Sequence, residues 1–267
     1  NAVLAEYDCP LTLRQIYYQM VARQYIKNTK NEYQKLGSHL VNARKTKLID
    51  DTKIVDRLRT SIRTNCWDNL GDFMQTVKYA YTKEKWTKQS YVVEVWCEKD
   101  AIAGVLQTIT DNYDIILYPC RGYNSYSALK EASERINKRP QTTIILYLGD
   151  YDPSGEDMTR DIKERLLNDF NSNAIVERIA LTIEQINDYN LPQDYAKKTD
   201  KRAKKFIAKN GNIAVELDAL PPNVLQEILK TEIEKYMDFN LWKEDCEEER
   251  IERIRLEEIV NNTLSLE

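Results

Sequence analysis

Short apolar runs alternate with amphipathic stretches between residues 91 and 181. Such runs are typical of strands that are buried on both faces of a sheet. We expect strands at residues 91–96, 115–118, 143–148 and 175–181. The stretches between them carry apolar residues at helical spacing and predict helices at residues 101–108, 125–137 and 156–170. Strands alternating with helices predict an α/β fold with a Rossmann-like parallel sheet covered by helices.

Apolar residues also recur at helical spacing near the start of the chain. Thr12, followed three residues later by Gln15, is a capping-box signal for a helix start. The apolar stripe of that helix is Leu13, Ile16, Tyr17, Met20 and Val21. A second stripe is formed by Tyr33, Leu36, Gly37, Leu40 and Val41. A β-like turn at residues 46–51 and a basic helix follow. Three short helices and a β-ribbon at this turn favour a winged helix-turn-helix domain.

The second helix of this domain has a polar and basic face opposite its apolar stripe. The second helix of a helix-turn-helix lies in the major groove, and basic side chains beside it contact phosphates. We therefore predict that double-stranded DNA contacts Lys35, Ser38, Asn42, Arg44, Lys45, Lys47 and Arg57. The lysine-rich segment at residues 197–205 is either a second phosphate contact or a solvated loop.

The changes of pattern divide the chain into three parts. Residues 1–88 are expected to form the winged-helix domain and a connector, which contains an amphipathic helix with Leu70, Phe73, Met74 and Val77 on one face. Residues 89–222 are expected to form the α/β domain, and residues 223–267 a C-terminal helical segment. From Lys243 onward the chain is dense in Glu and Arg, which indicates a helix that faces solvent or a partner.

Charge is distributed unevenly over these parts. The whole chain of 267 residues has a net charge of −4. Residues 1–88 carry 16 Lys and Arg against 9 Asp and Glu, or +7, whereas the remainder carries 23 against 34, or −11. A basic module joined to an acidic one is consistent with binding of a polyanion by the basic part.

Several classes of protein are disfavoured by the composition. The five cysteines are scattered without CxxC spacing, and His39 is the single histidine, so a structural zinc site or a histidine-based triad is not expected. No apolar run approaches the length of a membrane span, and no signal-like segment precedes the first helix. We expect an intracellular, cytoplasmic protein with free thiols.

Carboxylates follow two of the expected strands. Asp150 and Asp152 come directly after the strand at 143–148, and Glu98 follows the strand at 91–96. Alternate residues at a strand end point the same way, and ligands of parallel sheets bind outside the carboxyl ends of the strands. Carboxylate oxygens are ligands that Mg²⁺ accepts, together with phosphates. The alternative is a pair of solvated turn residues, because Asp-Pro and Ser-Gly favour turns.

A tyrosine and an arginine share one face of the first long helix. Tyr18 lies one residue off the buried stripe, and Arg14 precedes it by four residues. A guanidinium beside a phenol can bind a phosphodiester and stabilise the phenolate as it attacks. The alternative is a surface tyrosine packed beside an arginine.

These two motifs together resemble a known family. Residues 12–18, Thr-Leu-Arg-Gln-Ile-Tyr-Tyr, resemble the tyrosine motif of the topoisomerase VI A subunit and of the meiotic double-strand-break transesterase. Glu98 with residues 149–155, Gly-Asp-Tyr-Asp-Pro-Ser-Gly, resembles the metal-binding signature of the Toprim domain, which those proteins carry next. The order of the modules agrees, and the resemblance covers roughly residues 8–220.

The resemblance implies a magnesium-dependent DNA-cleaving enzyme that acts as a homodimer. It implies that Tyr18 is the nucleophile, that Arg14 accompanies it, and that Glu98, Asp150 and Asp152 hold Mg²⁺, with Glu98 also catalytic. In such proteins the tyrosine of one subunit is thought to work with the metal site of the other and to form a 5′-phosphotyrosyl link. The chain lacks a Gly-rich nucleotide loop, so strand passage would need a separate ATPase subunit.

Two other functions stay open at this point. A Toprim site could hydrolyse phosphodiesters with metal-activated water and leave no covalent adduct. Alternatively, the chain could bind DNA without cutting it. An aspartyl phosphatase is a more distant alternative, because the Asp-x-Asp pair of those enzymes follows the first strand.

Overall fold

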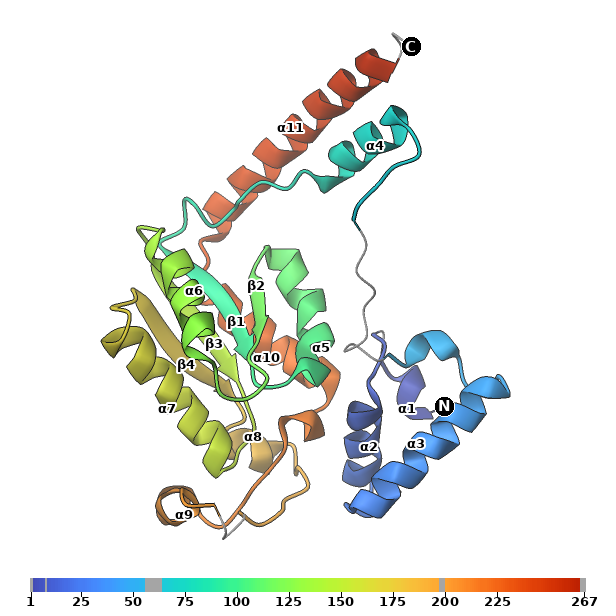
Figure 1. The fold of residues 1–267 in the computed structure, drawn as a ribbon, viewed down its shortest axis with the longest axis vertical. Coiled ribbons are helices and arrows are strands. Elements are labelled where there is room, and N and C mark those ends of the chain that lie inside the picture. Colours follow the sequence, from blue (N-terminus) through green and yellow to red (C-terminus); the bar gives the residue numbers. More distant parts are fainter. Residues whose placement is uncertain (1, 8, 56–63, 197–199, 265–267) are drawn as a thin grey trace.

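A parallel sheet forms the centre of the molecule. This computed structural model describes residues 2–7, 9–55, 64–196 and 200–264. Four strands are paired in the order β2-β1-β3-β4, and every neighbouring pair is parallel (Figure 1). Their bounds are Tyr91–Cys97 for β1, Ile116–Pro119 for β2, Thr142–Leu148 for β3 and Ala174–Ala180 for β4. The prediction of an α/β fold with a parallel sheet is confirmed, and the strand bounds are within one residue of those expected.

Helices cover both faces of the sheet. The linking helices are α5 (Asp100–Thr110), α6 (Tyr126–Asn137) and α7 (Pro153–Asn168), and α10 (Pro222–Glu234) follows later in the chain. On one face Val95 and Leu146 pack in a core with residues of α5 and α10; on the other, Trp96 and Tyr147 pack in a core with residues of α6 and α7. Successive strand residues thus alternate between two apolar cores, which explains the uninterrupted apolar runs.

The chain reverses its direction of winding between β1 and β3. From β1 the chain passes through α5 to β2 on one side, and from β3 it passes through α7 to β4 on the other. Such a switch point leaves a crevice at the carboxyl ends of the two strands. Cys97 lies opposite Leu148 in the register of β1 and β3. Glu98 and Gly149 therefore enter this crevice side by side.

The N-terminal part is helical. Its helices are α1 (Ala2–Ala5), α2 (Leu13–Ala22) and α3 (Lys30–Lys45). The capping box of Thr12 and Gln15 is present, and Ile16, Tyr17 and Val21 of the expected stripe are buried. Leu11 and Ile16 belong to the same apolar core as Leu217, so this part packs directly on the sheet domain.

The β-ribbon that the sequence predicts after α3 is not found in the residues that the structure describes. The N–H groups of Thr46 and Leu48 donate instead to carbonyl oxygens of α3, over 3.0 and 2.9 Å, and so extend the helix end. A 3₁₀ turn, η1 (Asp51–Lys53), and an isolated bridge between Leu11 and Ile54 follow. The expected basic helix with Arg57 lies outside the described residues.

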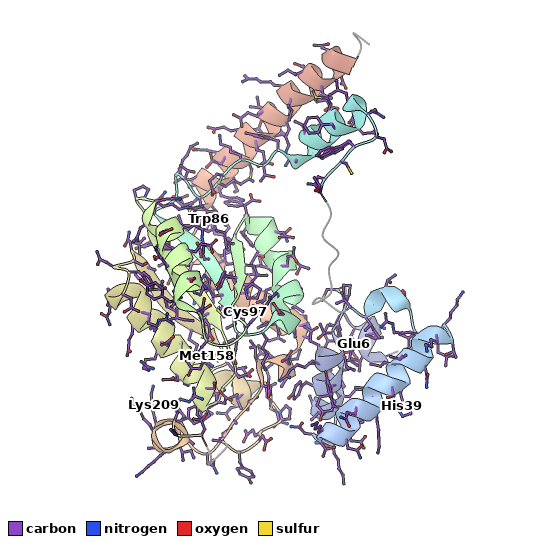
Figure 2. All side chains as sticks on the ribbon, viewed as in Figure 1. Glu6, His39, Trp86, Cys97, Met158 and Lys209 are labelled. Atoms are coloured by element: carbon purple, nitrogen blue, oxygen red, sulfur yellow. The ribbon has the colours of Figure 1, made fainter. Side chains whose placement is uncertain are left out.

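An arm of two helices extends from the sheet domain. The connector helix α4 (Leu70–Ala80) packs against the C-terminal helix α11 (Phe239–Leu264), as Figure 1 shows. Lys78 of α4 pairs with Glu257 of α11, and Lys83, just after α4, pairs with Glu248 at 2.9 Å. The charged tail thus has a partner within the chain. Trp86 is buried at the base of the arm (Figure 2), where it stacks edge-to-face on Trp242.

The remaining elements are short. They are η2 (Asp111–Tyr113), α8 (Ile183–Asp188), α9 (Ala203–Asn210) and η3 (Leu217–Ala219). Within the described part of the chain, every helix is too short or too polar to cross a membrane.

Candidate functional site

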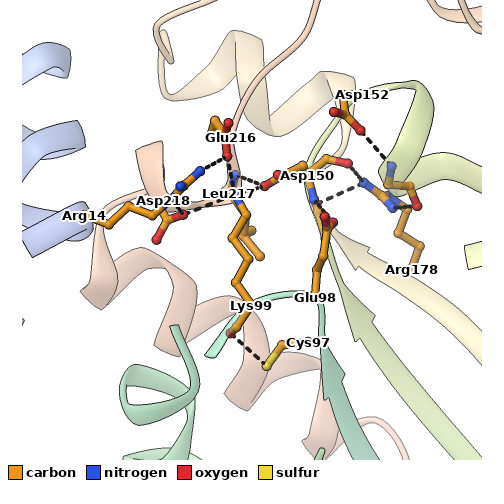
Figure 3. A network of polar contacts seen from close by, with 12 residues as sticks. Arg14, Cys97, Glu98, Lys99, Asp150, Asp152, Arg178, Glu216, Leu217 and Asp218 are labelled. Atoms are coloured by element: carbon orange, nitrogen blue, oxygen red, sulfur yellow. Dashed lines mark hydrogen bonds and ion pairs between the residues drawn. The ribbon is translucent and has the colours of Figure 1, made fainter. Parts of the chain in front are cut away.

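Three acidic residues occupy the crevice at the switch point (Figure 3). Glu98 accepts a hydrogen bond from the backbone N–H of Asp150 at 2.9 Å. The Oδ1 atom of Asp150 accepts from the Lys99 ammonium at 2.6 Å and from the N–H of Leu217 at 2.8 Å. Asp152 caps α7 by accepting from the N–H of Gly155 at 2.7 Å. The two strands thus bring the predicted acids together, and each acid already has a partner within the protein.

Two glycines allow this arrangement. A Cβ atom on Gly149 would lie 2.9 Å from Oε2 of Glu98, so any larger residue would displace that carboxylate. A Cβ atom on Gly155 would lie 2.1 Å from the carbonyl oxygen of Asp150. The turn from Asp150 to Gly155 can therefore close only because Gly155 lacks a side chain, and Gly149 leaves room for the Glu98 carboxylate.

Arg178 holds this turn from the neighbouring strand. Its guanidinium is largely buried and donates to the carbonyl oxygens of Gly149 at 3.0 Å and of Gly155 at 3.1 Å. It also donates to the carbonyl oxygen of Asp150 at 2.5 Å and pairs with Glu156 at 3.2 Å. The carbonyls at the end of the strand therefore have a charged donor, which fixes the backbone that carries the acids.

Two further acids reach the site from a distant segment. An antiparallel bridge between Tyr151 and Val215 places Glu216 and Asp218 beside Asp150. The Lys99 ammonium contacts both carboxylates, at 3.2 Å from Asp218 and closer still to Glu216. The sequence analysis assigned this segment to the end of the domain and did not identify either acid as a site residue. Their spacing of two residues, which repeats that of Asp150 and Asp152, was the signal that could have found them.

Arg14 and Tyr18 reach the same place from α2. Arg14 donates to Glu216 at 2.6 Å and to Asp218 at 3.0 Å, and its guanidinium carbon lies 5.5 Å from the centroid of the Tyr18 ring. Tyr17 turns the other way into the core, where its hydroxyl donates to Oδ1 of Asn28 at 3.0 Å. The prediction that Tyr17 belongs to the buried stripe of the helix and that Tyr18 lies beside it agrees with this geometry.

A single cavity of about 170 Å³ joins the two halves of the site. Its lining includes Tyr18, Asp150, Asp152 and Glu216, whereas Glu98 lies behind Asp150. The remaining lining residues are Asn28, Pro153, Pro192, Asp194, Tyr195, Asp200, Ala214, Val215 and Ala219. Five of the lining residues carry carboxylates, and cations of the protein already pair with three of them, Asp150, Asp200 and Glu216.

The cavity perturbs the ionisation of the groups that surround it. Burial raises the pKa of the Asp150 carboxyl well above its usual range, although Lys99 acts in the opposite direction. Burial also raises the pKa of Glu98. The pKa of Tyr18 is raised by burial and by the negative charge of Glu216, and these two effects outweigh Arg14. Arg14 thus favours the phenolate, as the sequence suggests, but its effect is smaller than that of burial and Glu216 together.

The chemistry of the donors fits a magnesium ion, but the ligand shell is incomplete. None of the hydrogen bonds among the described residues uses the second carboxylate oxygen of Glu98 or of Asp152. Mg²⁺ usually takes one or two carboxylates, completed by water and substrate phosphate. Within residues 2–7, 9–55, 64–196 and 200–264, however, no three acidic, His or Cys side chains are gathered closely enough to hold one ion.

The predicted DNA-contacting residues are spread over α3 and the turn after it. Lys35 is paired with Glu32 at 3.0 Å, and Ser38 donates to a carbonyl of its own helix at 3.2 Å. Ser38 and Asn42 line one shallow hollow, and Arg44, Lys45 and Lys47 line another at the end of the helix. Arg57 lies outside the described residues.

No protein-family model matches this sequence, and no curated protein matches it either.

Replacing Gly155 with Ala is expected to destabilise the protein by about 1–3 kcal/mol, the usual cost of forcing extra atoms into a packed site. The new methyl group would collide with the backbone at Asp150. Urea unfolding measures the change. Ser154→Ala, in the same turn, adds no atoms and should have little effect; equal stability of both variants would show that the turn is not closed as described.

Glu216 is expected to make folding stability depend on pH in the acid range. Burial would raise its pKa, but the charges of Lys99 and Arg14 outweigh burial and lower the pKa from 4.5 to about 2. Because the folded pKa is depressed, the stabilisation is present above pH 4.5 and disappears as the pH falls toward about 2. Urea unfolding at pH 5, 4 and 3 should show a steeper loss for the parent than for Glu216→Gln. Parallel curves would contradict the ion pairs.

Proposed function

We propose that this protein cleaves DNA strands in a magnesium-dependent reaction in which Tyr18 is the nucleophile. The observation that carries the proposal is that Tyr18 of α2 and the acids of the sheet line one cavity, with the Arg14 guanidinium over the Tyr18 ring. A nucleophile, a phosphate-binding cation and hard metal ligands are the parts that phosphoryl transfer to a protein side chain requires.

The roles of the chain's own residues follow from their positions. Glu98, Asp150 and Asp152 are the acids that would hold the ion, one or two of them together with water and substrate phosphate, and Arg178 fixes the backbone between them. A bound Mg²⁺ would supply stabilisation of the charge that develops on the phosphate. The Tyr18 oxygen forms a bond to phosphorus while the bond from phosphorus to the 3′ oxygen breaks. The phenol loses its proton to solvent, and the released 3′ oxygen gains one, which leaves a 5′-phosphotyrosyl link and a 3′-hydroxyl.

We further propose that residues 2–55 act as a winged-helix-like DNA-binding module and that the sheet domain is of the Toprim type. The exposed basic residues at the end of α3 support DNA contact at Lys45 and Lys47. The topological switch point with its acids supports the Toprim assignment. Cutting both strands of a duplex needs two such sites, so we propose a homodimer, and strand passage would call for a separate ATPase subunit.

Hydrolysis by metal-activated water is the second candidate. The raised pKa of Tyr18 favours it, because a phenol that resists ionisation is a weak nucleophile. The two reactions differ in their products, since only the tyrosine reaction leaves protein bound to a DNA end.

Supercoiled plasmid incubated with the protein and Mg²⁺ should become nicked or linear, with protein attached to the 5′ ends. Tyr18→Phe should lower this cleavage by at least about 1,000-fold, because it removes the nucleophile. Asp150→Asn should abolish both cleavage and attachment. Gel electrophoresis in SDS, with and without proteinase, measures both products. Cleavage by Tyr18→Phe without attached protein would establish hydrolysis, and tight DNA binding with no cleavage would establish a binding protein.

Mixing two inactive variants determines whether Tyr18 works with the acids of its own subunit. Tyr18 and Asp150 of the same chain line one cavity, so we expect action within one subunit. A mixture of Tyr18→Phe and Asp150→Asn subunits, unfolded and refolded together, should then stay inactive. Restored nicking would mean that each tyrosine acts with the acids of the partner, as the family resemblance implies.

A further inference from the structure

The Glu216 carboxylate is held by two cations from different parts of the chain. Both Arg14 and Lys99 direct their donors at the same atom, Oε2 of Glu216; the distance from Nη2 of Arg14 is 2.6 Å, and the Lys99 ammonium is closer. A guanidinium and an ammonium that converge on one oxygen form the kind of site that binds an oxygen of a phosphate. Within this chain, that site contains a carboxylate.

We propose that Arg14 and Lys99 form the subsite for the scissile phosphodiester, and that Glu216 occupies it in place of the phosphate until DNA binds. The proposal rests on the function proposed above and adds to it the place where the substrate phosphate lies. Tyr18 and Glu216 line the same cavity, so a phosphate in the place of the Glu216 carboxylate would share that cavity with Tyr18.

Exposure distinguishes Glu216 from Asp218. The Asp218 side chain is 0% exposed. It contacts Arg14 at 3.0 Å and Lys99 at 3.2 Å, and it therefore keeps both cations in place. The Glu216 side chain is 38% exposed, so solvent reaches this carboxylate but not that of Asp218. Exchanging its carboxylate for a phosphodiester oxygen leaves the local charge unchanged, because each carries one negative charge.

The cavity also requires such an exchange. A volume of about 170 Å³ is too small for a nucleotide with its neighbouring phosphates, and Arg14 has its Nε and Nη2 donors engaged by acids. While Glu216 stays in place, the donors that Arg14 and Lys99 direct at its Oε2 atom are not open to a phosphate oxygen. Displacement of this side chain would therefore couple DNA binding to assembly of the site.

Binding of inorganic phosphate to the intact protein in EDTA tests the proposal without any cleavage. Glu216→Ala should bind phosphate at least about tenfold more tightly than the parent, since the competing charge is removed. Broadening of the ³¹P resonance and the rise in Tm with phosphate measure this change. Glu216→Gln provides the same test if the Ala variant folds poorly. Adding Arg14→Gln or Lys99→Met to Glu216→Ala should abolish the gain.

Glu164→Gln is a matched control, because it removes an exposed carboxylate that pairs with Arg160 on α7, outside the site. It should bind phosphate as the parent does. Phosphate binding by Glu216→Ala and Glu216→Gln that equals that of the parent would overturn the proposal, even if the parent cleaves DNA through Tyr18. A gain that persists after Arg14 or Lys99 is replaced would also overturn it. Failure of the parent to cut DNA would instead refute the proposed function and leave the phosphate result standing.

Discussion

The repulsion between closely spaced acids is the constraint on which the rest of this structure depends. Asp150, Glu216 and Asp218 come from two distant segments, yet all three contact the Lys99 ammonium. Charges at such distances in a partly buried site would drive the segments apart unless cations lay between them. Lys99 and Arg14 supply those cations, and Arg14 belongs to the N-terminal module. The same ion pairs that relieve the repulsion therefore help to bind the module to the sheet domain.

The ionisable groups around the cavity show the effects of this constraint. Burial keeps the pKa of Asp150 high, and the phenol of Tyr18 is harder to ionise than usual because it is buried and Glu216 lies near it. The cations that a phosphate would need are engaged by carboxylates. In the proposed function, the substrate phosphate and the metal would therefore replace charged contacts that the protein now makes with itself.

Local patterns in the sequence were sufficient to predict the strands of the sheet and the acids at its edge. The apolar runs predicted all four strands within one residue, and the position of Glu98, Asp150 and Asp152 after them placed these acids at one edge of the sheet. The four-residue spacing of Arg14 and Tyr18 predicted a shared helix face, which the ring contact confirms.

Contacts between distant segments could not be predicted in this way. Glu216 and Asp218 reach the site through a bridge to Tyr151, and nothing in the local pattern around residue 216 specifies that pairing. The prediction of a β-ribbon at residues 46–51 is not met there, because the N–H groups of Thr46 and Leu48 bond to carbonyl oxygens of α3. The pattern of side chains does not reveal which of these backbone hydrogen bonds will form. Likewise, the Glu and Arg residues from Lys243 onward indicated a helix that faces solvent or a partner, but they did not show that α4 packs against this helix.

A double-mutant cycle between Arg14 and Glu216 tests most directly whether ion pairs hold the N-terminal module to the acidic site. The unfolding free energies of the parent, Arg14→Gln, Glu216→Gln and the double variant give the coupling between the two side chains. The ion pair across the two parts of the molecule predicts that the double variant is less destabilised than the sum of the single variants, by about 0.5–3 kcal/mol. Additive effects would contradict this claim, because they would mean that the module is not held to the site by this contact.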